Sequence, residues 1–341
     1  MADPILRIKD LTVEFHTEDG VVHAVTDVSY DLHPGEILGI VGESGSGKSV
    51  SMLSTLGLIP QGKVVQGEAL FKGEDLLKLS KRRLREIRGG EMAMIFQDPM
   101  TSLNPVLTIG DQISEAIKVH NDGISEGDAL KRTVDLLELV GVPFAERRVK
   151  QYPHEFSGGM RQRAMIAMAI ANNPSVLIAD EPTTALDVTI QAQIVEVLKA
   201  AQEETHAATV LITHDLGLIA ELADRVVVMY AGRVVELGDV FAIFNAPGHP
   251  YTVGLMNSLA RLDMDQERLE PIPGQPPSLV SPPPGCAFHP RCALSQGRAI
   301  CRTDIPELRP FGDGEPHASR CHFSEELLAA SVRAGAVQPV S

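Results

Sequence analysis

Aromatic and basic side chains are both scarce in this 341-residue chain. Tryptophan is absent, and aromatic residues make up only 4% of the sequence, which argues against the stacking platforms that bind single-stranded nucleic acid. Lys and Arg number 30 against 45 Asp and Glu, so the formal net charge is −15. Because coating DNA or RNA, or adhering to anionic lipid, requires a basic surface, we expect neither kind of partner.

Long apolar runs are missing as well. No stretch approaches the roughly 18 consecutive apolar residues of a transmembrane helix, so we expect no segment that spans a membrane unaided. The first residues, MADPILRIKD, lack the basic and then apolar pattern of a signal peptide. The sequence therefore predicts a cytoplasmic protein that reaches a membrane only by docking on a membrane protein.

Cysteine is absent from the first 285 residues, and all four cysteines stand near the end of the chain. They are Cys286, Cys292, Cys301 and Cys321. In a reducing cytoplasm such a cluster is more typical of metal ligands than of disulfides.

Strand-like and helix-like segments alternate along the first 240 residues, which predicts an α/β fold. Residues 36–41 are apolar on both faces, as in a central strand of a covered parallel sheet, and a helix follows from about Gly47. Further strands are expected at 176–179 and 209–213, with a helix at 190–204 between them, and 108–140 has a helical pattern. Past about residue 240 the character changes, and eight of the 23 prolines lie between 271 and 290, which indicates a linker or a rigid, irregular appendage rather than more sheet.

One segment fits the phosphate-binding loop pattern completely: Gly42-Glu43-Ser44-Gly45-Ser46-Gly47-Lys48-Ser49. Its glycines allow backbone N–H groups to turn inward around phosphate oxygens. Lys48 can reach the β- and γ-phosphates, and the Ser49 hydroxyl can ligate Mg²⁺.

A second segment, residues 176–181, is an apolar strand that ends in two acids, Asp180 and Glu181. At the carboxyl end of a parallel strand, Asp180 would hold the Mg²⁺ shell and Glu181 would face the attacking water. Strands often end in Asp or Glu, so this pair alone is weak evidence for a catalytic site. It becomes strong evidence because a phosphate-binding loop precedes it in the chain. Together the two segments predict a nucleoside triphosphatase.

Further motifs in order along the chain make the sequence resemble the ATP-binding subunits of ABC transporters. Residues 156–163, Phe-Ser-Gly-Gly-Met-Arg-Gln-Arg, are similar to the family signature, although Phe156 and Met160 depart from its commonest form. Gln97 matches the family's Q-loop, residues 184–187 (Thr-Ala-Leu-Asp) its D-loop, and His214 its switch histidine. The resemblance covers about residues 5–240. It implies a P-loop NTPase of the ABC ATPase type, with a RecA-like core, an antiparallel β subdomain and a helical subdomain at about 100–165.

The resemblance also implies a role for each matching residue. Glu181, His214, Lys48 and Gln97 would carry catalysis, and Mg²⁺ would be held through Ser49, Gln97 and Asp180. The residues that would bind ATP within the chain are Phe15, Gly42, Ser44, Gly45, Ser46, Gly47, Lys48, Ser49 and Val50. Phe15 has a second interpretation, because a Phe in a strand commonly belongs to the core. Those that would contact ATP on a partner subunit are Ser157, Gly158, Gly159 and Asp187.

Within the family, the oligopeptide/dipeptide importer branch is resembled most closely, at residues 42–47, 96–105, 247–252 and the cysteine segment. This divides the chain into an ATP-binding domain at 1–240 and a C-terminal extension at 241–341. In some members of the branch the four cysteines hold a [4Fe–4S] cluster. Four thiolates also suit structural zinc, but the intervals of 5, 8 and 19 residues between the cysteines lack the tight pair usual in zinc ribbons. Iron–sulfur is the favoured interpretation and zinc the alternative, either of which could act as a clip that folds the appendage.

The expected function is hydrolysis of ATP to energise peptide import. The expected partners are a second ATP-binding subunit, identical or homologous, two transmembrane permease subunits and, indirectly, an extracytoplasmic peptide-binding protein. The chain would then lie at the cytoplasmic face of the cell membrane. Relatives move nickel or other solutes, and the substrate is not encoded in this chain. Two alternatives are a soluble ABC ATPase unconnected with transport and an iron–sulfur-regulated nucleotide sensor.

Overall fold

The computed structural model describes residues 3–184, 187–258, 271–312 and 316–327. Its chain forms two compact units, each assembled from separate segments. Unit 1 contains residues 1–5, 32–36 and 72–212, and unit 2 contains residues 6–31, 37–71 and 213–341. The fold is α/β, as the alternation of segments predicts.

Three parallel strands form the centre of unit 1: β6 (Met92–Ile95), β7 (Val176–Asp180) and β8 (Ala208–Ile212). β7 pairs with β6 on one side and with β8 on the other. Every residue of β7 and β8 is buried, which explains why these runs are apolar on both faces. Because the three strands are parallel, their carboxyl ends share one edge of the sheet.

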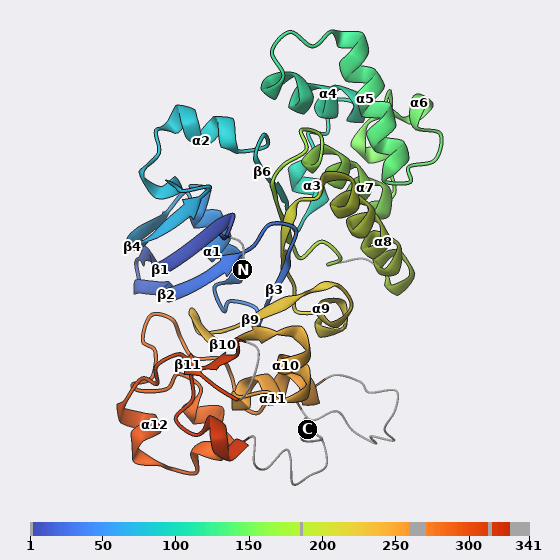
Figure 1. Ribbon diagram of the computed structural model, residues 1–341. Helices are drawn as coiled ribbons and strands as arrows, with labels where there is room; N and C mark the ends of the chain where they lie inside the picture. The colour runs from blue at the N-terminus through green and yellow to red at the C-terminus, as the bar shows by residue number, and fades with distance from the viewer. Residues whose placement is uncertain (1–2, 185–186, 259–270, 313–315, 328–341) are drawn as a thin grey trace. The chain divides into compact units, whose positions relative to one another are not determined.

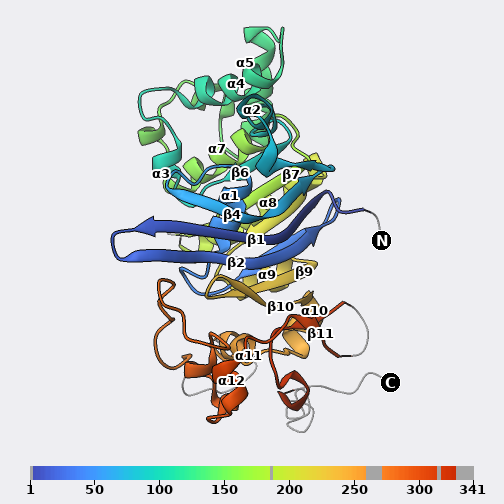
Figure 2. The same ribbon diagram turned by 90° about the vertical axis from the view of Figure 1, so that its left-hand side faces the viewer.

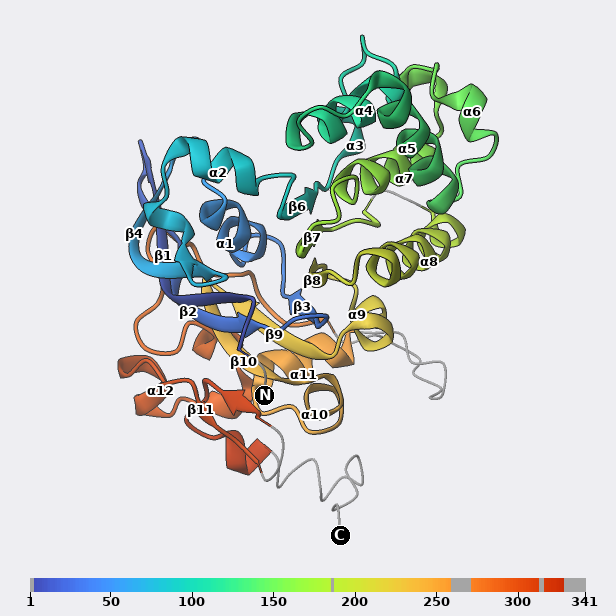
Figure 3. The ribbon, with the colours of Figure 1, turned by 45° about the horizontal axis from the view of Figure 1, so that its top comes forward.

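Helices make up most of the rest of unit 1, and Figure 3 shows α4, α5 and α7 as neighbours, in agreement with their contacts. The region 108–140 forms two helices, where the sequence pattern predicts one helical stretch, because Ser125 caps a new helix by accepting a hydrogen bond from Asp128 N. The helices and short strand of unit 1 are β5 (Glu74–Asp75), α2 (Lys81–Ile87), α3 (Pro99–Ser102), α4 (Ile109–His120), α5 (Glu126–Leu139), α6 (Ala145–Arg148), α7 (Gly158–Ala169) and α8 (Val188–Thr205), with 3₁₀ turns at Leu76–Lys78 and Pro153–Glu155.

Unit 2 begins with three long strands in the order β2 (Gly20–Leu32), β1 (Leu6–Thr17) and β4 (Gly62–Phe71), which lie side by side in Figure 2. β4 was not expected from the sequence. It pairs antiparallel with β1, and the register shifts after Lys9. At this irregularity Gly67 has φ +110°, and a Cβ there would lie 2.6 Å from Leu11 Cα, so only glycine fits.

A second group of unit 2 strands supports the phosphate loop. β3 (Ile37–Val41) runs parallel to β9 (Arg225–Tyr230), and β9 pairs antiparallel with β10 (Arg233–Asp239). Helix α1 (Lys48–Thr55) follows β3, and α9 (Leu216–Leu222) precedes β9. Gly39 of β3 lies against α9, where a Cβ would meet Ile219 Cδ1 at 2.6 Å.

The C-terminal extension, coloured orange to red in Figure 1, consists of short elements. They are α10 (Val240–Asn245), α11 (Pro250–Asn257), α12 (Ala299–Thr303), β11 (Arg309–Pro310) and β12 (Ala318–Ser319), with 3₁₀ turns at His289–Arg291 and Ala293–Ser295. The expectation of no further sheet here is wrong, because β12 pairs antiparallel with β10, and β11 pairs with β12. The two added strands cover the polar edge of β10, which would otherwise be left unpaired.

A buried carboxylate joins the extension to β10. Glu236 is fully buried and accepts hydrogen bonds from the amides of Gly248 and His249 and from Nε2 of His317, the last at 2.7 Å. Three donors from two segments of the extension thus meet at one side chain of β10. In the described parts of the chain, no helix combines the length and apolar character needed to cross a bilayer.

Candidate functional site

The loop between β3 and α1 has the geometry of a phosphate cradle. Gly42 has φ +152°, and a Cβ there would lie 2.2 Å from Met229 O. Gly47 has φ +98°, and a Cβ would lie 2.4 Å from Ala24 O. Both positions therefore exclude any other residue. Buried Lys48 donates from Nζ to the carbonyl oxygens of Gly42 at 2.8 Å and Glu43 at 3.1 Å.

The same loop has donors that suit an anion. The Ser46 hydroxyl is buried and makes no hydrogen bond within the described structure, so it has an unmet capacity to donate. Ser44 and Gly45 are exposed, whereas Ser49 and Val50 are partly exposed in the first turn of α1. With the amides at the start of α1 and the ammonium of Lys48, these groups fit the phosphates of a nucleotide.

Glu181 follows β7 with a backbone conformation that is rare for its residue type. Its φ is +46°, and its amide donates to Ile212 O at 2.8 Å. The carboxylate atom Oε2 accepts hydrogen bonds from Gln97 Nε2 at 2.9 Å and from Thr184 Oγ1 at 2.8 Å. Non-glycine residues held in this region of φ cluster at functional sites. Asp180, the last residue of β7, is buried.

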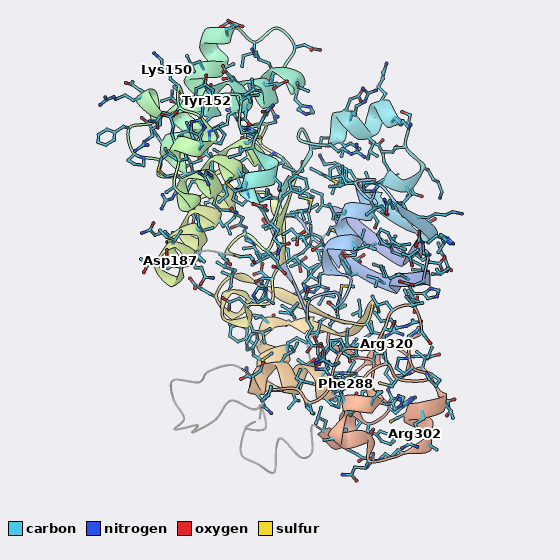
Figure 4. All side chains as sticks on the ribbon, turned by 180° about the vertical axis from the view of Figure 1, so that it is seen from behind. Lys150, Tyr152, Asp187, Phe288, Arg302 and Arg320 are labelled. Atoms are coloured by element: carbon cyan, nitrogen blue, oxygen red, sulfur yellow. The ribbon has the colours of Figure 1, made fainter. Side chains whose placement is uncertain are left out.

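Ser157 and Asp187 each cap a helix of unit 1. The Ser157 hydroxyl accepts from Met160 N at 3.3 Å at the start of α7, and the Asp187 carboxylate, labelled in Figure 4, accepts from Ile190 N at 3.0 Å at the start of α8. Ser157 and Gly158 are exposed, and Gly159 is buried against Ile190. The exposed start of α7 has a helix dipole and a hydroxyl that suit an anion, whereas the Asp187 carboxylate at the start of α8 is itself negative. Residues 185–186 of the expected D-loop lie outside the described residues.

Two other expected residues stand in unit 2. His214 is exposed, just before Asp215, which caps α9 by accepting from Gly217 N at 2.8 Å. Phe15 is half-buried in β1 opposite Gly62 of β4. A Cβ at Gly62 would lie 2.8 Å from Phe15 Cζ, so the ring packs against Gly62 and keeps part of its surface exposed.

Comparison with curated proteins decides the family. The dipeptide transport ATP-binding protein DppD of Bacillus subtilis (strain 168) is 54% identical over 335 residues, which is 98% of both chains. The protein of the same name from Escherichia coli (strain K12) is 51% identical over 320 residues, covering 94% of this chain and 96% of the relative. The chain belongs to the ABC transporter ATP-binding proteins.

Family models and solved structures agree with this assignment. The ABC transporter model matches residues 25–184, and the model of the oligopeptide/dipeptide transporter C-terminal region matches residues 235–301. A dimeric ATP-binding cassette in a post-hydrolysis state, bound to ADP and Pi, is 28% identical with a TM-score of 0.62, covering 69% of this chain and 98% of that one. The expected ABC ATPase fold is thereby confirmed.

In this ABC protein the four cysteines line one small cavity of about 10 Å³, together with His289 and His322. Cys286 N donates to Cys301 O at 3.0 Å, which joins two of the cysteine-bearing segments. Burial raises the pKa of Cys286 to about 12 and that of Cys321 to about 11. Cys301 and Cys321 are buried, and Cys286 and Cys292 are partly buried. Among the residues that the structure describes, no three His, Cys, Asp or Glu side chains stand close enough to hold a metal ion.

The sequence reasoning missed two residues of the extension that contact the phosphate loop. Arg291 forms an ion pair with Glu43 at 2.7 Å, and the Tyr251 hydroxyl accepts a hydrogen bond from Glu43 N at 2.7 Å. The positions are separated by more than 200 residues, so no local pattern could join them. The one available signal was an acid within a phosphate-binding loop.

Proposed function

We propose that this chain is the ATP-hydrolysing subunit of an ABC importer for di- or oligopeptides. The observation that carries the proposal is the hydrogen-bonded pair of Gln97 and Glu181 in a chain that also has a complete phosphate loop. The peptide substrate class is supported by the names of the relatives and by the match to the oligopeptide/dipeptide transporter C-terminal region.

In the proposed reaction, water attacks the γ-phosphate of ATP in line with the leaving ADP oxygen. Lys48 and the amides at the start of α1 neutralise charge on the phosphates. Ser49, Asp180 and Gln97 would hold Mg²⁺, which supplies further charge neutralisation when bound. Glu181 orients the water and accepts its proton, and His214 assists at the γ-phosphate. The adenine would lie against Phe15, and Gly42, Ser44, Gly45, Ser46, Gly47 and Val50 complete the nucleotide contacts.

We further propose that two ATP-binding subunits enclose ATP between them. The exposed helix start at Ser157 and Gly158, with Gly159 and Asp187, would act on ATP bound to the partner subunit, in keeping with the dimeric cassette among the similar structures. Two permease subunits would hold the pair at the cytoplasmic face of the membrane, and the region at about 100–165 would contact them. In this division residues 1–240 hydrolyse ATP and residues 241–341 form the branch-specific extension.

For the extension we propose that Cys286, Cys292, Cys301 and Cys321 hold a [4Fe–4S] cluster, with structural zinc as the alternative. The presence of all four cysteines in the lining of one small cavity supports a four-thiolate centre, which would draw the thiolates closer together when the metal binds. The test is the iron, zinc and acid-labile sulfide content of chain purified without oxygen. About four irons and four sulfides per chain, lost in Cys286→Ser, support the cluster. One zinc per chain without sulfide supports the alternative. A chain that contains neither iron nor zinc would overturn the proposed site.

The function itself is tested by co-expression with candidate permease subunits, followed by co-purification and ATPase assay. We expect a stable complex whose ATP hydrolysis is lost in Glu181→Gln. An ATPase that never associates with a membrane subunit would favour the soluble alternative. Nucleotide binding without hydrolysis, altered by the state of the cysteines, would favour the sensor.

A further inference from the structure

Glu43 is the one acidic residue of the phosphate loop. It is the second residue of the phosphate loop, whose other members are Gly, Ser and Lys. A carboxylate in a phosphate-binding loop repels a bound polyphosphate, because the Coulomb energy between such charges is appreciable even near a protein surface. Unless its charge is neutralised, Glu43 would weaken ATP binding.

Arg291 supplies that neutralisation from the C-terminal extension. Its NH1 and NH2 groups donate to Glu43 Oε2 at 2.7 Å and Oε1 at 3.0 Å. The Arg291 side chain is 5% exposed and that of Glu43 27%. A bidentate guanidinium–carboxylate pair is stronger and better oriented than a single contact. Arg291 also donates to Pro273 O at 2.8 Å and to the Tyr230 hydroxyl at 3.3 Å, which fixes its orientation.

Tyr251 holds the backbone of the same residue. Its hydroxyl accepts from Glu43 N at 2.7 Å, and its side chain is fully buried. The Glu43 amide is therefore not directed at phosphate. The carbonyl oxygens of Gly42 and Glu43 in turn accept from Lys48 Nζ. A continuous series of hydrogen bonds thus runs from Arg291 and Tyr251, through Glu43, to the lysine of the loop.

We infer that Arg291 and Tyr251 are positioning residues for the phosphate loop, and that Arg291 cancels the charge of Glu43 so that the loop accepts ATP. The inference rests on the proposed function. It makes the extension part of the nucleotide site rather than a separate appendage.

The contacts around Arg291 connect this role with the cysteine segment. Arg291 directly precedes Cys292 in the sequence. The ring of Phe288, labelled in Figure 4, lies 5.2 Å from that of Tyr230 and 5.4 Å from that of Tyr251, and it also lines the cavity of the four cysteines. The cysteine-bearing segment therefore packs against Tyr230, which binds Arg291, and against Tyr251, which binds Glu43.

Charge variants of the full chain, in complex with its permeases, test the inference through the KM for ATP and kcat. Arg291→Ala leaves Glu43 unneutralised, so we expect the KM to rise about tenfold with a smaller change in kcat. Glu43→Gln leaves Arg291 in excess and should lower the KM. The double variant should return within about twofold of wild type. Arg291→Lys retains the charge and should raise the KM less than Arg291→Ala.

Arg7→Ala is the matched control. Arg7 also forms a bidentate pair, with Asp31 at 3.0 and 3.3 Å in the same unit, and that pair joins β1 to β2. Its KM for ATP should stay at the wild-type value. Added salt should shrink the effect of Arg291→Ala, since the repulsion it exposes is screened.

A purely structural role predicts a different result: Glu43→Gln and Arg291→Ala would both raise the KM, and the double variant would not recover. That result would overturn the inference and leave the proposed function standing. The same holds if Arg291→Ala has the wild-type KM for ATP while the wild type hydrolyses ATP normally. Should Arg291→Ala fail to fold, the direction of the Glu43→Gln effect and the partial effect of Arg291→Lys decide the same question. A wild-type chain that neither binds nor hydrolyses ATP would overturn the proposed function as well.

Discussion

Gln97 Nε2 donates a hydrogen bond of 2.9 Å to Glu181 Oε2, so the residues that follow β6 and β7 meet at one carboxylate. Thr184 Oγ1 donates to the same oxygen at 2.8 Å. The carboxylate is held by two neutral donors on a backbone with φ +46°. In an ABC ATPase such a fixed carboxylate is suited to orient a water molecule.

Glu181→Gln should bind ATP but hydrolyse it at least about 100-fold more slowly, because the amide preserves the shape of the site and cannot accept the proton. The variant should also accumulate as a closed ATP-bound dimer. Steady-state ATPase assays and size-exclusion chromatography with ATP check both outcomes. Turnover near the wild-type rate would show that Glu181 is not the base.

Ser157→Asp separates the two roles of the α7 cap. Asp caps helices as well as Ser, so the free energy of unfolding should change by less than about 0.5 kcal/mol. A negative charge at this exposed helix start should repel the partner's γ-phosphate and slow hydrolysis about 100-fold. Thermal unfolding and ATPase assays measure the two effects. Ser157→Asn, which caps without the charge, is the control and should be less impaired than Ser157→Asp.

Glu236→Ala should destabilise unit 2 by about 3 kcal/mol, since two backbone amides and His317 lose a buried acceptor. Urea unfolding measures the difference. Glu236→Gln retains an acceptor oxygen and should cost less. Equal losses in the two variants would argue against the hydrogen bonds as the cause.

His249 should make the folded protein less stable as the pH falls. Burial lowers the pKa of His249 from 6.5 to about 3, and nearby Arg320 adds to the shift. Between those values the unfolded chain binds a proton that the folded chain does not, so stability is complete above pH 6.5 and declines below it. The loss reaches about 2 kcal/mol near about pH 5.

The variant His249→Asn isolates this contribution. The His249 ring nitrogen Nδ1 accepts from Tyr251 N at 3.0 Å at the start of α11, and an Asn oxygen can replace it as a cap that does not titrate. Denaturant unfolding from pH 7.5 to 5 (about the range in which His titrates) should show a flatter profile for the variant. Parallel profiles would mean that other groups carry the acid sensitivity.

Local patterns in the sequence predicted the nucleotide-binding segments because their chemistry is local. Gly42 to Ser49 depend on φ values and amides of one loop, and Asp180 and Glu181 stand at the end of one apolar strand. β4 was missed because Gly62 and Gly67 interrupt its alternation of apolar and polar residues. These glycines are required only because β1 packs closely against them. β11 and β12 are two residues long and exist only by pairing with β10. The Arg291–Glu43 pair spans 248 positions, a separation that periodicity cannot bridge.

The central claim, that this chain energises peptide import, is tested most directly by uptake of a labelled dipeptide into vesicles that contain the assembled transporter. Wild-type complex supplied with peptide-binding protein and ATP should accumulate the peptide, and complex with Glu181→Gln should not. Equal uptake by the two complexes, or ATP hydrolysis by the wild type without any movement of peptide, would contradict the account.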